Sequence, residues 1–159
     1  MDISKRLPSR AELAPVYAVI VMMVYSWTIL WFYYNLPGWL GFLNFGEVIG
    51  IFAYSMTTNF LESLAVLAGI VLCAVILPRR WFSDAFVARG AALAMLVLGL
   101  MMYIAKQFET KEYYPAELIR WSPALLAVAF VLVFLLGRVM FLRKAIEFFA
   151  DRAIIFLYI

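Results

Sequence analysis

Four long apolar stretches, separated by shorter polar segments, dominate the chain. They run from about residue 14 to 34, 55 to 77, 86 to 104 and 122 to 140. Each matches the roughly 20 residues that a helix needs to cross a bilayer. The apolar runs are continuous rather than alternating, which favours helices over membrane β-strands. The pattern predicts an all-α integral membrane protein in which residues 1–159 form one four-helix transmembrane bundle.

Residues 36–50 do not fit a plain loop between the first two spans. They carry few charges and include glycines at 38, 41, 46 and 50. A continuous helix from Glu47 to Leu77 would be about 46 Å long at ~1.5 Å per residue, against a hydrocarbon core of ~30 Å. We therefore expect a short interfacial or shallow re-entrant element on the outer face. The alternative is an extended second helix that protrudes from the membrane.

The C-terminal segment 145–159 reads AIEFFADRAIIFLYI and mixes charged and apolar positions. One interpretation is an amphipathic helix on the cytoplasmic surface. The other is the start of a truncated fifth span that belongs to a longer chain.

The distribution of charged residues predicts how the chain is oriented in the membrane. Only 14% of the residues are charged, compared with about 25% in soluble domains. Ten of the thirteen Lys and Arg residues lie in the N-terminal tail, in the segment from Arg79 to Arg89 that links the second and third spans, or from Arg138 onward at the end of the fourth span. The positive-inside rule then predicts that both termini are cytoplasmic in a plasma (inner) membrane. The net charge of +3 is small and does not suggest nucleic-acid binding.

Missing residue types narrow the chemistry. The chain has no histidine and a single cysteine, Cys73, so the usual haem ligand, the usual general base and a thiolate zinc cluster are absent. Phosphate-binding glycine motifs and the GxSxG nucleophile motif are absent as well. We predict no cofactor and no metal, and the sequence favours a non-catalytic protein.

Glu62 is the most informative polar residue because it lies inside the second span. Fifteen helical residues separate it from Leu77, which places it about 22 Å from the inner interface. An ionisable group at that depth is a functional candidate by default. It shares a stripe with Ser55, Thr58 and Asn59, and we expect this stripe to face the bundle interior as a polar site.

Two readings of Glu62 stay open. It is either a buried packing residue paired with Lys106 or Arg120, or part of a site for a proton, cation or polar ligand. Elsewhere, Tyr17, Tyr25 and Thr28 share a stripe of the first span that we expect to be a packing face with locally bonded hydroxyls.

A basic and aromatic step, Arg79-Arg80-Trp81, stands at the expected inner interface. It suits contact with anionic lipid headgroups, although a role in topology alone explains it as well.

These observations favour an accessory or scaffold subunit of a larger membrane assembly. Its expected partners are the lipid bilayer and either other membrane subunits or further copies of the chain. The alternative is a small oligomeric transporter or channel that uses Glu62. A lipid-modifying enzyme is the least favoured, because no convergent set of polar groups is evident.

Overall fold

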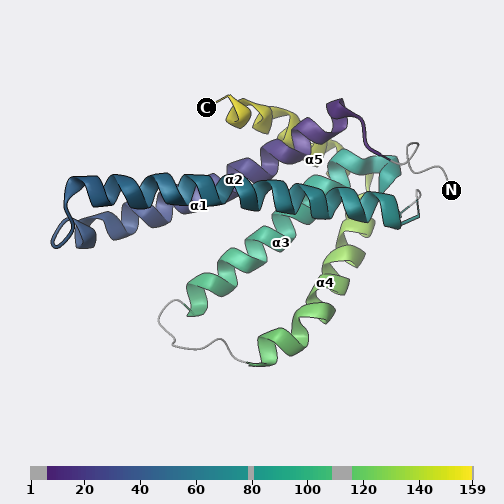
Figure 1. Ribbon diagram of the computed structural model, residues 1–159. Coiled ribbons are helices and arrows are strands. Elements are labelled where there is room, and N and C mark those ends of the chain that lie inside the picture. Colours follow the sequence, from purple (N-terminus) through teal and green to yellow (C-terminus); the bar gives the residue numbers. More distant parts are fainter. Residues whose placement is uncertain (1–6, 79–80, 109–115, 159) are drawn as a thin grey trace.

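A computed structural model describes residues 7–78, 81–108 and 116–158, with the backbone alone for 116–119. Within these ranges the regular structure is helical and no strand occurs. The elements are α1 (Arg10–Trp39), α2 (Phe45–Ile76), the 3-10 helix η3 (Ser83–Ala85), α3 (Phe86–Phe108), α4 (Ala116–Leu136), α5 (Met140–Ala153) and the 3-10 helix η4 (Ile154–Leu157). Figure 1 shows them as two diverging helical hairpins with α5 lying across their shared end.

The structure confirms that the protein has helices long and apolar enough to cross a membrane. By length and composition, α1, α2 and Ser83–Phe108 can each cross a membrane. A fourth crossing arises only if Arg120–Leu136 and Met140–Leu157 are counted together, and these two helices are bent by 103°.

The first hairpin pairs the two longest helices, α1 and α2, which pack side by side. They contain 30 and 32 residues, so they are about 45 and 48 Å long at ~1.5 Å per residue. Polar residues fix their starts. The carboxylate of Glu12 accepts a 2.8 Å hydrogen bond from the backbone N–H of Ser9, and Glu47 makes the same 2.8 Å contact with the N–H of Asn44.

The prediction of a separate interfacial or re-entrant element at residues 36–50 is wrong. Helix α1 continues to Trp39 and α2 begins at Phe45, as in the alternative of an extended second helix. Pro37 lies inside the last turn of α1; it has no N–H to donate to the carbonyl four residues earlier, and the helix ends two residues after it. The Phe32 ring contacts the rings of Trp39 and Phe52, with centroid distances of 5.4 and 5.0 Å. These contacts hold together the end of the hairpin where α1 turns into α2.

Helix α3 is the centre of the bundle and packs against α1, α2, α4 and α5. Five of its buried residues are alanine or glycine, and such small residues let the neighbouring helices approach closely. At Gly90, an added Cβ would lie 3.2 Å from Val16 of α1 and 3.3 Å from Ile70 of α2. By contrast, α4 contributes only Ala129 and Val133 to the buried core among its described side chains.

The predicted fourth span, 122–140, ends earlier than expected. Helix α4 stops at Leu136 and the chain turns at residues 137–139 before α5 begins at Met140. Helix α5 then packs against α1 and α3, with Ala150 and Ala153 buried. The C-terminal segment thus forms a helix distinct from α4, and the amphipathic surface helix and the truncated fifth span both stay predictions. Its position relative to a membrane stays a prediction.

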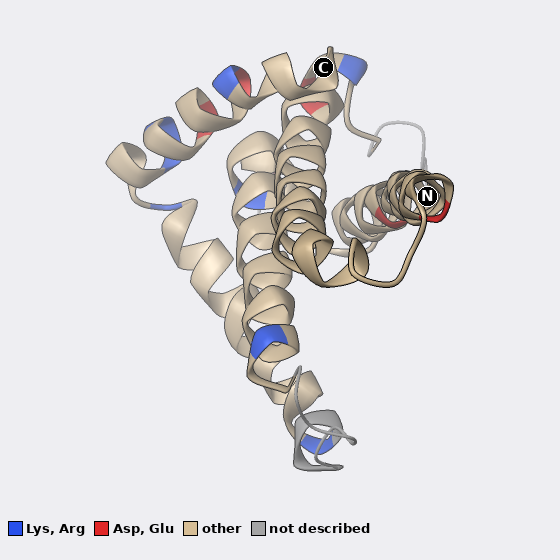
Figure 2. Ribbon diagram, turned by 90° about the vertical axis from the view of Figure 1, so that its left-hand side faces the viewer, with Lys and Arg blue, Asp and Glu red and all other residues tan. Residues whose placement is uncertain are grey.

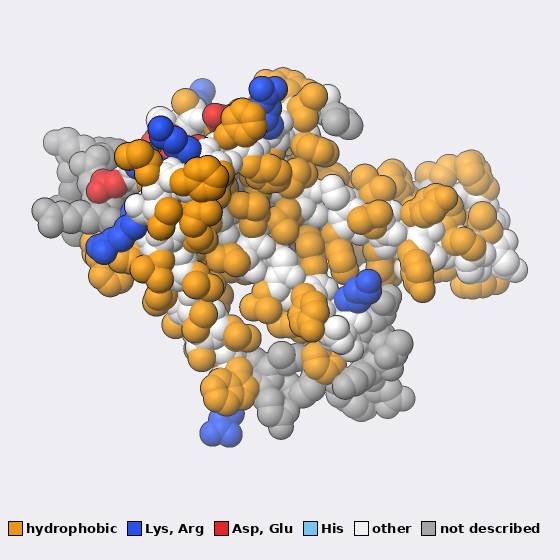
Figure 3. Space-filling view, turned by 180° about the vertical axis from the view of Figure 1, so that it is seen from behind, with side chains coloured by type: hydrophobic (Ala, Val, Ile, Leu, Met, Phe, Trp, Pro, Cys, Tyr) orange, Lys and Arg blue, Asp and Glu red, His pale blue; other side chains and the backbone are white. Residues whose placement is uncertain are grey.

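Charged and apolar side chains are segregated over the molecule. The start of α1, the start of α3, the end of α4 and α5 lie at one end (Figure 1), and Lys, Arg, Asp and Glu concentrate along α5 (Figure 2). Hydrophobic side chains cover the projecting first hairpin and most of the face shown in Figure 3. Such a surface is unsuited to water and suits a bilayer.

Candidate functional site

The interface between α1 and α2 carries a row of polar side chains in an otherwise apolar bundle. We refer to it as the polar seam, and it consists of Tyr17, Tyr25 and Thr28 of α1 and Asn59 and Ser63 of α2. The two α2 residues are the deepest, because Asn59 is 4% exposed and Ser63 is 0% exposed.

Hydrogen bonds of the polar seam join the two helices directly. The Thr28 hydroxyl donates to Asn59 Oδ1 over 3.0 Å. The hydroxyl oxygens of Tyr17 and Ser63 are 3.3 Å apart, and Ser63 Oγ donates to the carbonyl of Phe60 over 2.8 Å. The expectation of a packing face on α1 is correct, but its hydroxyls bond to α2 rather than locally.

The amide nitrogen of Asn59 is the exception within the polar seam. It is fully buried, and no hydrogen-bond acceptor for Nδ2 is present among the described residues. Leaving a buried donor unsatisfied costs about 1–3 kcal/mol. The seam therefore offers one free amide donor in an apolar interface, but its five side chains include no carboxylate or amine for proton transfer.

Glu62 lies outside the polar seam, so the expectation that it faces the bundle interior is wrong. The buried residues of α2 near it are Asn59, Ser63 and Ile70, whereas Glu62 is exposed. At ~100° per residue, Glu62 is roughly 80° around the helix from the centre of this buried arc. The sequence identifies the polar stripe but not the direction in which it faces around the helix axis. Packing of α2 against Tyr17 and Thr28 of α1 determines that direction.

The remaining members of the predicted polar site bond within their own helix. The Ser55 hydroxyl donates to the carbonyl of Ile51 over 2.9 Å, and the Thr58 hydroxyl donates to the carbonyl of Tyr54 over 3.0 Å. The structure therefore joins Asn59 to Thr28 of α1, and it does not join Asn59 to Glu62, Thr58 or Ser55 by hydrogen bonds.

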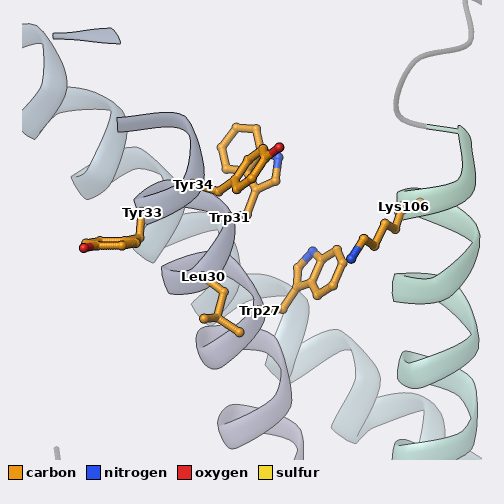
Figure 4. A pocket seen from close by; sticks show the side chains of 7 residues that line it. Trp27, Leu30, Trp31, Tyr33, Tyr34 and Lys106 are labelled. Atoms are coloured by element: carbon orange, nitrogen blue, oxygen red, sulfur yellow. The ribbon is translucent and has the colours of Figure 1, made fainter. Parts of the chain in front are cut away.

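Neither proposed ion-pair partner reaches Glu62 in the described part of the chain. Lys106 is near the end of α3, where its ammonium points toward the ring of Trp27 (Figure 4). With Ala105 and the α1 residues Leu30, Trp31, Tyr33 and Tyr34, this pair lines an apolar groove of about 540 Å³. Arg120 is exposed near the start of α4.

The predicted lipid contact at the inner interface is described only in part. Arg79 and Arg80 lie outside the described residues. Trp81 is 57% exposed, and its ring centroid is 5.3 Å from that of Phe134 in α4. Lipid contact by this step stays a prediction.

Sequence reasoning overlooked Arg89 as a site residue. The distribution of Lys and Arg assigns it only to the orientation of the chain. In the structure it lies in the first turn of α3 and is only 6% exposed. A charged residue four positions into an apolar span was the available signal.

No cluster of three or more potential metal ligands from His, Cys, Asp and Glu occurs in the ranges that the structure describes. No family model, no curated protein and no solved structure matches this chain. Any functional conclusion must therefore come from the geometry of its own residues.

Proposed function

We propose that the protein is a non-catalytic membrane subunit that docks the outward face of α2 against a helix of another membrane protein. In this proposal the chain crosses a plasma (inner) membrane four times, with α5 on the cytoplasmic side and both termini cytoplasmic. The basic residues of α5 and of the starts of α1 and α3 support this orientation.

The observation that carries the proposal is the position of Glu62. Its carboxylate is exposed on the surface of α2, about 22 Å from Leu77 along the helix and therefore within a ~30 Å hydrocarbon core. No hydrogen bond or ion pair to Glu62 is present among the described residues. A charge facing lipid at this depth costs several kcal/mol, so a polar partner from a second chain is the simplest way to stabilise it.

The surface next to Glu62 suits such a partner. Ala65 and Gly69 are both exposed and four residues apart, and no atom outside α2 lies within 4 Å of a Cβ added at Gly69. Small residues at this spacing let two membrane helices approach closely. The α2 face thus combines a close-packing surface with a carboxylate that needs a partner.

Extraction from native membranes in mild detergent tests the proposal. We expect the wild-type chain to elute in a complex with other polypeptides. Glu62→Leu and Gly69→Ile should each release the chain from that complex while it remains folded. Gly50→Ile is the matched control, because Gly50 is about 100° around α2 from Gly69 and also has open space around it. Elution of the wild type without partner polypeptides would contradict the proposal.

A second candidate is an oligomeric transporter or channel, favoured by the same exposed carboxylate. Several copies would bring their Glu62 side chains together along a shared pathway. In that case the wild type elutes as a homo-oligomer, and Glu62→Gln abolishes proton or cation flux in reconstituted vesicles. Unchanged flux in this variant would rule the transporter out.

A further inference from the structure

The turn between α4 and α5 is built over a buried arginine. Arg89, in the first turn of α3, is 6% exposed. A Cβ added at Gly137 would collide with Nε of Arg89 and lie 3.0 Å from its Cγ. Glycine at this position therefore makes room for the Arg89 side chain beneath the turn.

A second guanidinium group lies at the same aromatic ring, and a third positive charge is close by. The Cζ atom of Arg138 is 4.5 Å from the centroid of the Phe134 ring, and the Cζ atom of Arg89 is 5.7 Å from it. Arg143, in the first turn of α5, is close enough to repel the charge of Arg89. We call Arg89, Arg138 and Arg143 the arginine cluster.

Two carboxylates accompany the arginine cluster. Asp84 of η3 attracts Arg89 electrostatically, and Glu147 accepts a 2.8 Å ion pair from Nε of Arg143. Two guanidinium groups beside one apolar ring repel each other more strongly than they would in water. A phosphate between them would relieve that repulsion, and the planar guanidinium group is the side chain best matched to phosphate oxygens.

An apolar hollow shares the Phe134 ring with the arginine cluster. Its volume is about 190 Å³, and it is lined by Leu77, Trp81, Phe82, Phe130, Val131, Val133 and Phe134. The exposed Trp81 ring on its rim is of the type that favours the headgroup layer of a bilayer. Basic and apolar surfaces thus meet at the junction between a membrane span and an amphipathic helix.

We propose that the arginine cluster binds the phosphate of an anionic glycerophospholipid whose apolar part enters the Phe134 hollow. Basic pockets between membrane helices on the cytoplasmic side are suited to such headgroups. This site is separate from the α2 face and does not depend on the proposed subunit role.

Native mass spectrometry of the full chain, purified with phosphatidylglycerol and phosphatidylcholine in equal amounts, tests the site. We expect the wild type to retain phosphatidylglycerol preferentially. Arg138→Gln and Arg143→Gln should each weaken that retention about fivefold, the effect of one basic residue at a membrane surface. These variants keep Arg89, so the buried side chain under the turn is undisturbed.

Arg152→Gln is the matched control. Arg152 also belongs to α5 and also lies over an aromatic ring, but that ring is Phe148, 5.2 Å away. Equal losses in Arg152→Gln and Arg138→Gln would overturn the proposal in favour of a general surface-charge effect. Equal retention of the two lipids by the wild type would overturn it as well. Displacement of the lipid by millimolar inorganic phosphate would show that the site takes a free anion instead.

Discussion

At the scale of single residues, the polar seam shows how a membrane helix pair is held in register. Thr28 and Asn59 bond across the interface, yet the Asn59 amide retains a donor that no described residue accepts. The Thr28 hydroxyl is therefore the one described partner of the Asn59 side chain, and without it both polar atoms of a buried amide would be unsatisfied.

Replacing Thr28 by valine tests this dependence. We expect Thr28→Val to destabilise the protein by about 0.6–1.7 kcal/mol, which spans the average and the maximum measured for hydrogen bonds between membrane helices. Unfolding of the purified protein in mixed micelles measures the change. Thr57→Val is the control, since the exposed Thr57 hydroxyl donates only to Ala53 of its own helix.

The Asn59→Leu variant separates packing from hydrogen bonding. Replacing both partners of a buried hydrogen bond by apolar groups can be nearly neutral. The double variant Thr28→Val, Asn59→Leu should therefore be more stable than Thr28→Val alone. A double variant that is less stable would contradict this account of the seam.

The sequence predicts that α2 carries a stripe of polar residues, but it does not predict which of them face the neighbouring helix. A polar run within an apolar span identifies Asn59 and Glu62 as unusual, because both are costly in lipid. Which of them faces inward depends on the neighbouring helix, and a difference of about 60° around the axis separates a buried amide from an exposed carboxylate. Sequence spacing alone does not resolve that angle.

At the scale of elements, local capping decides where the long helices begin. Span existence was predictable because continuous apolar runs are a strong signal, but the lengths of α1 and α2 were not. An Asn-x-x-Glu pattern at Asn44 and Glu47 is a capping box, and it marks the start of α2 well before the apolar run at residue 55. Bilayer thickness is a poor guide to helix length when a helix is free to project beyond the core.

Substitution of Asn44 tests the start of α2. Asn44→Ala removes the 3.0 Å hydrogen bond from the Glu47 N–H to Asn44 Oδ1, and loss of such a cap costs about 1 kcal/mol. We expect faster hydrogen exchange of the first-turn amides of α2, measured by mass spectrometry. Asn35→Ala is the comparison, because Asn35 donates to the Trp31 carbonyl inside α1 and caps no helix. Unchanged exchange in Asn44→Ala would show that another contact fixes this end.

At the scale of the whole molecule, the separation of basic and aromatic ends gives the bundle a direction. The starts of α1 and α3, which carry Arg10 and Arg89, lie with the basic helix α5 at the shared end of the hairpins, whereas the groove at Lys106 and Trp27 is formed by the last turns of α3 and the second half of α1. This separation was predictable, because the distribution of Lys and Arg is visible in the sequence. The divergence of the two hairpins was not, because it follows from the packing of α3 and α5 against α1.

Cysteine labelling tests the direction. In a Cys73→Ala background, the Gly46→Cys variant should react with a membrane-impermeant thiol reagent in intact cells. Gly46 lies in the first turn of α2, which the proposed orientation places on the outer side of the membrane. The Ser9→Cys and Lys144→Cys variants should react only after the membrane is opened. Reaction of either variant in intact cells would reverse the proposed orientation.

The packing of α5 against both α1 and α3 has a consequence for biogenesis. These contacts join α5 to α1, a helix that precedes it in the chain by α2, α3 and α4, so the shared end of the bundle stays open while those three helices are being translated. A nascent chain that ends at Gly137 contains α1 to α4 and still exposes the surfaces of α1 and α3 that α5 covers. Packing at this end of the bundle is therefore completed only after α5 has been synthesised, and the surfaces that it covers are open to chaperones and proteases until then.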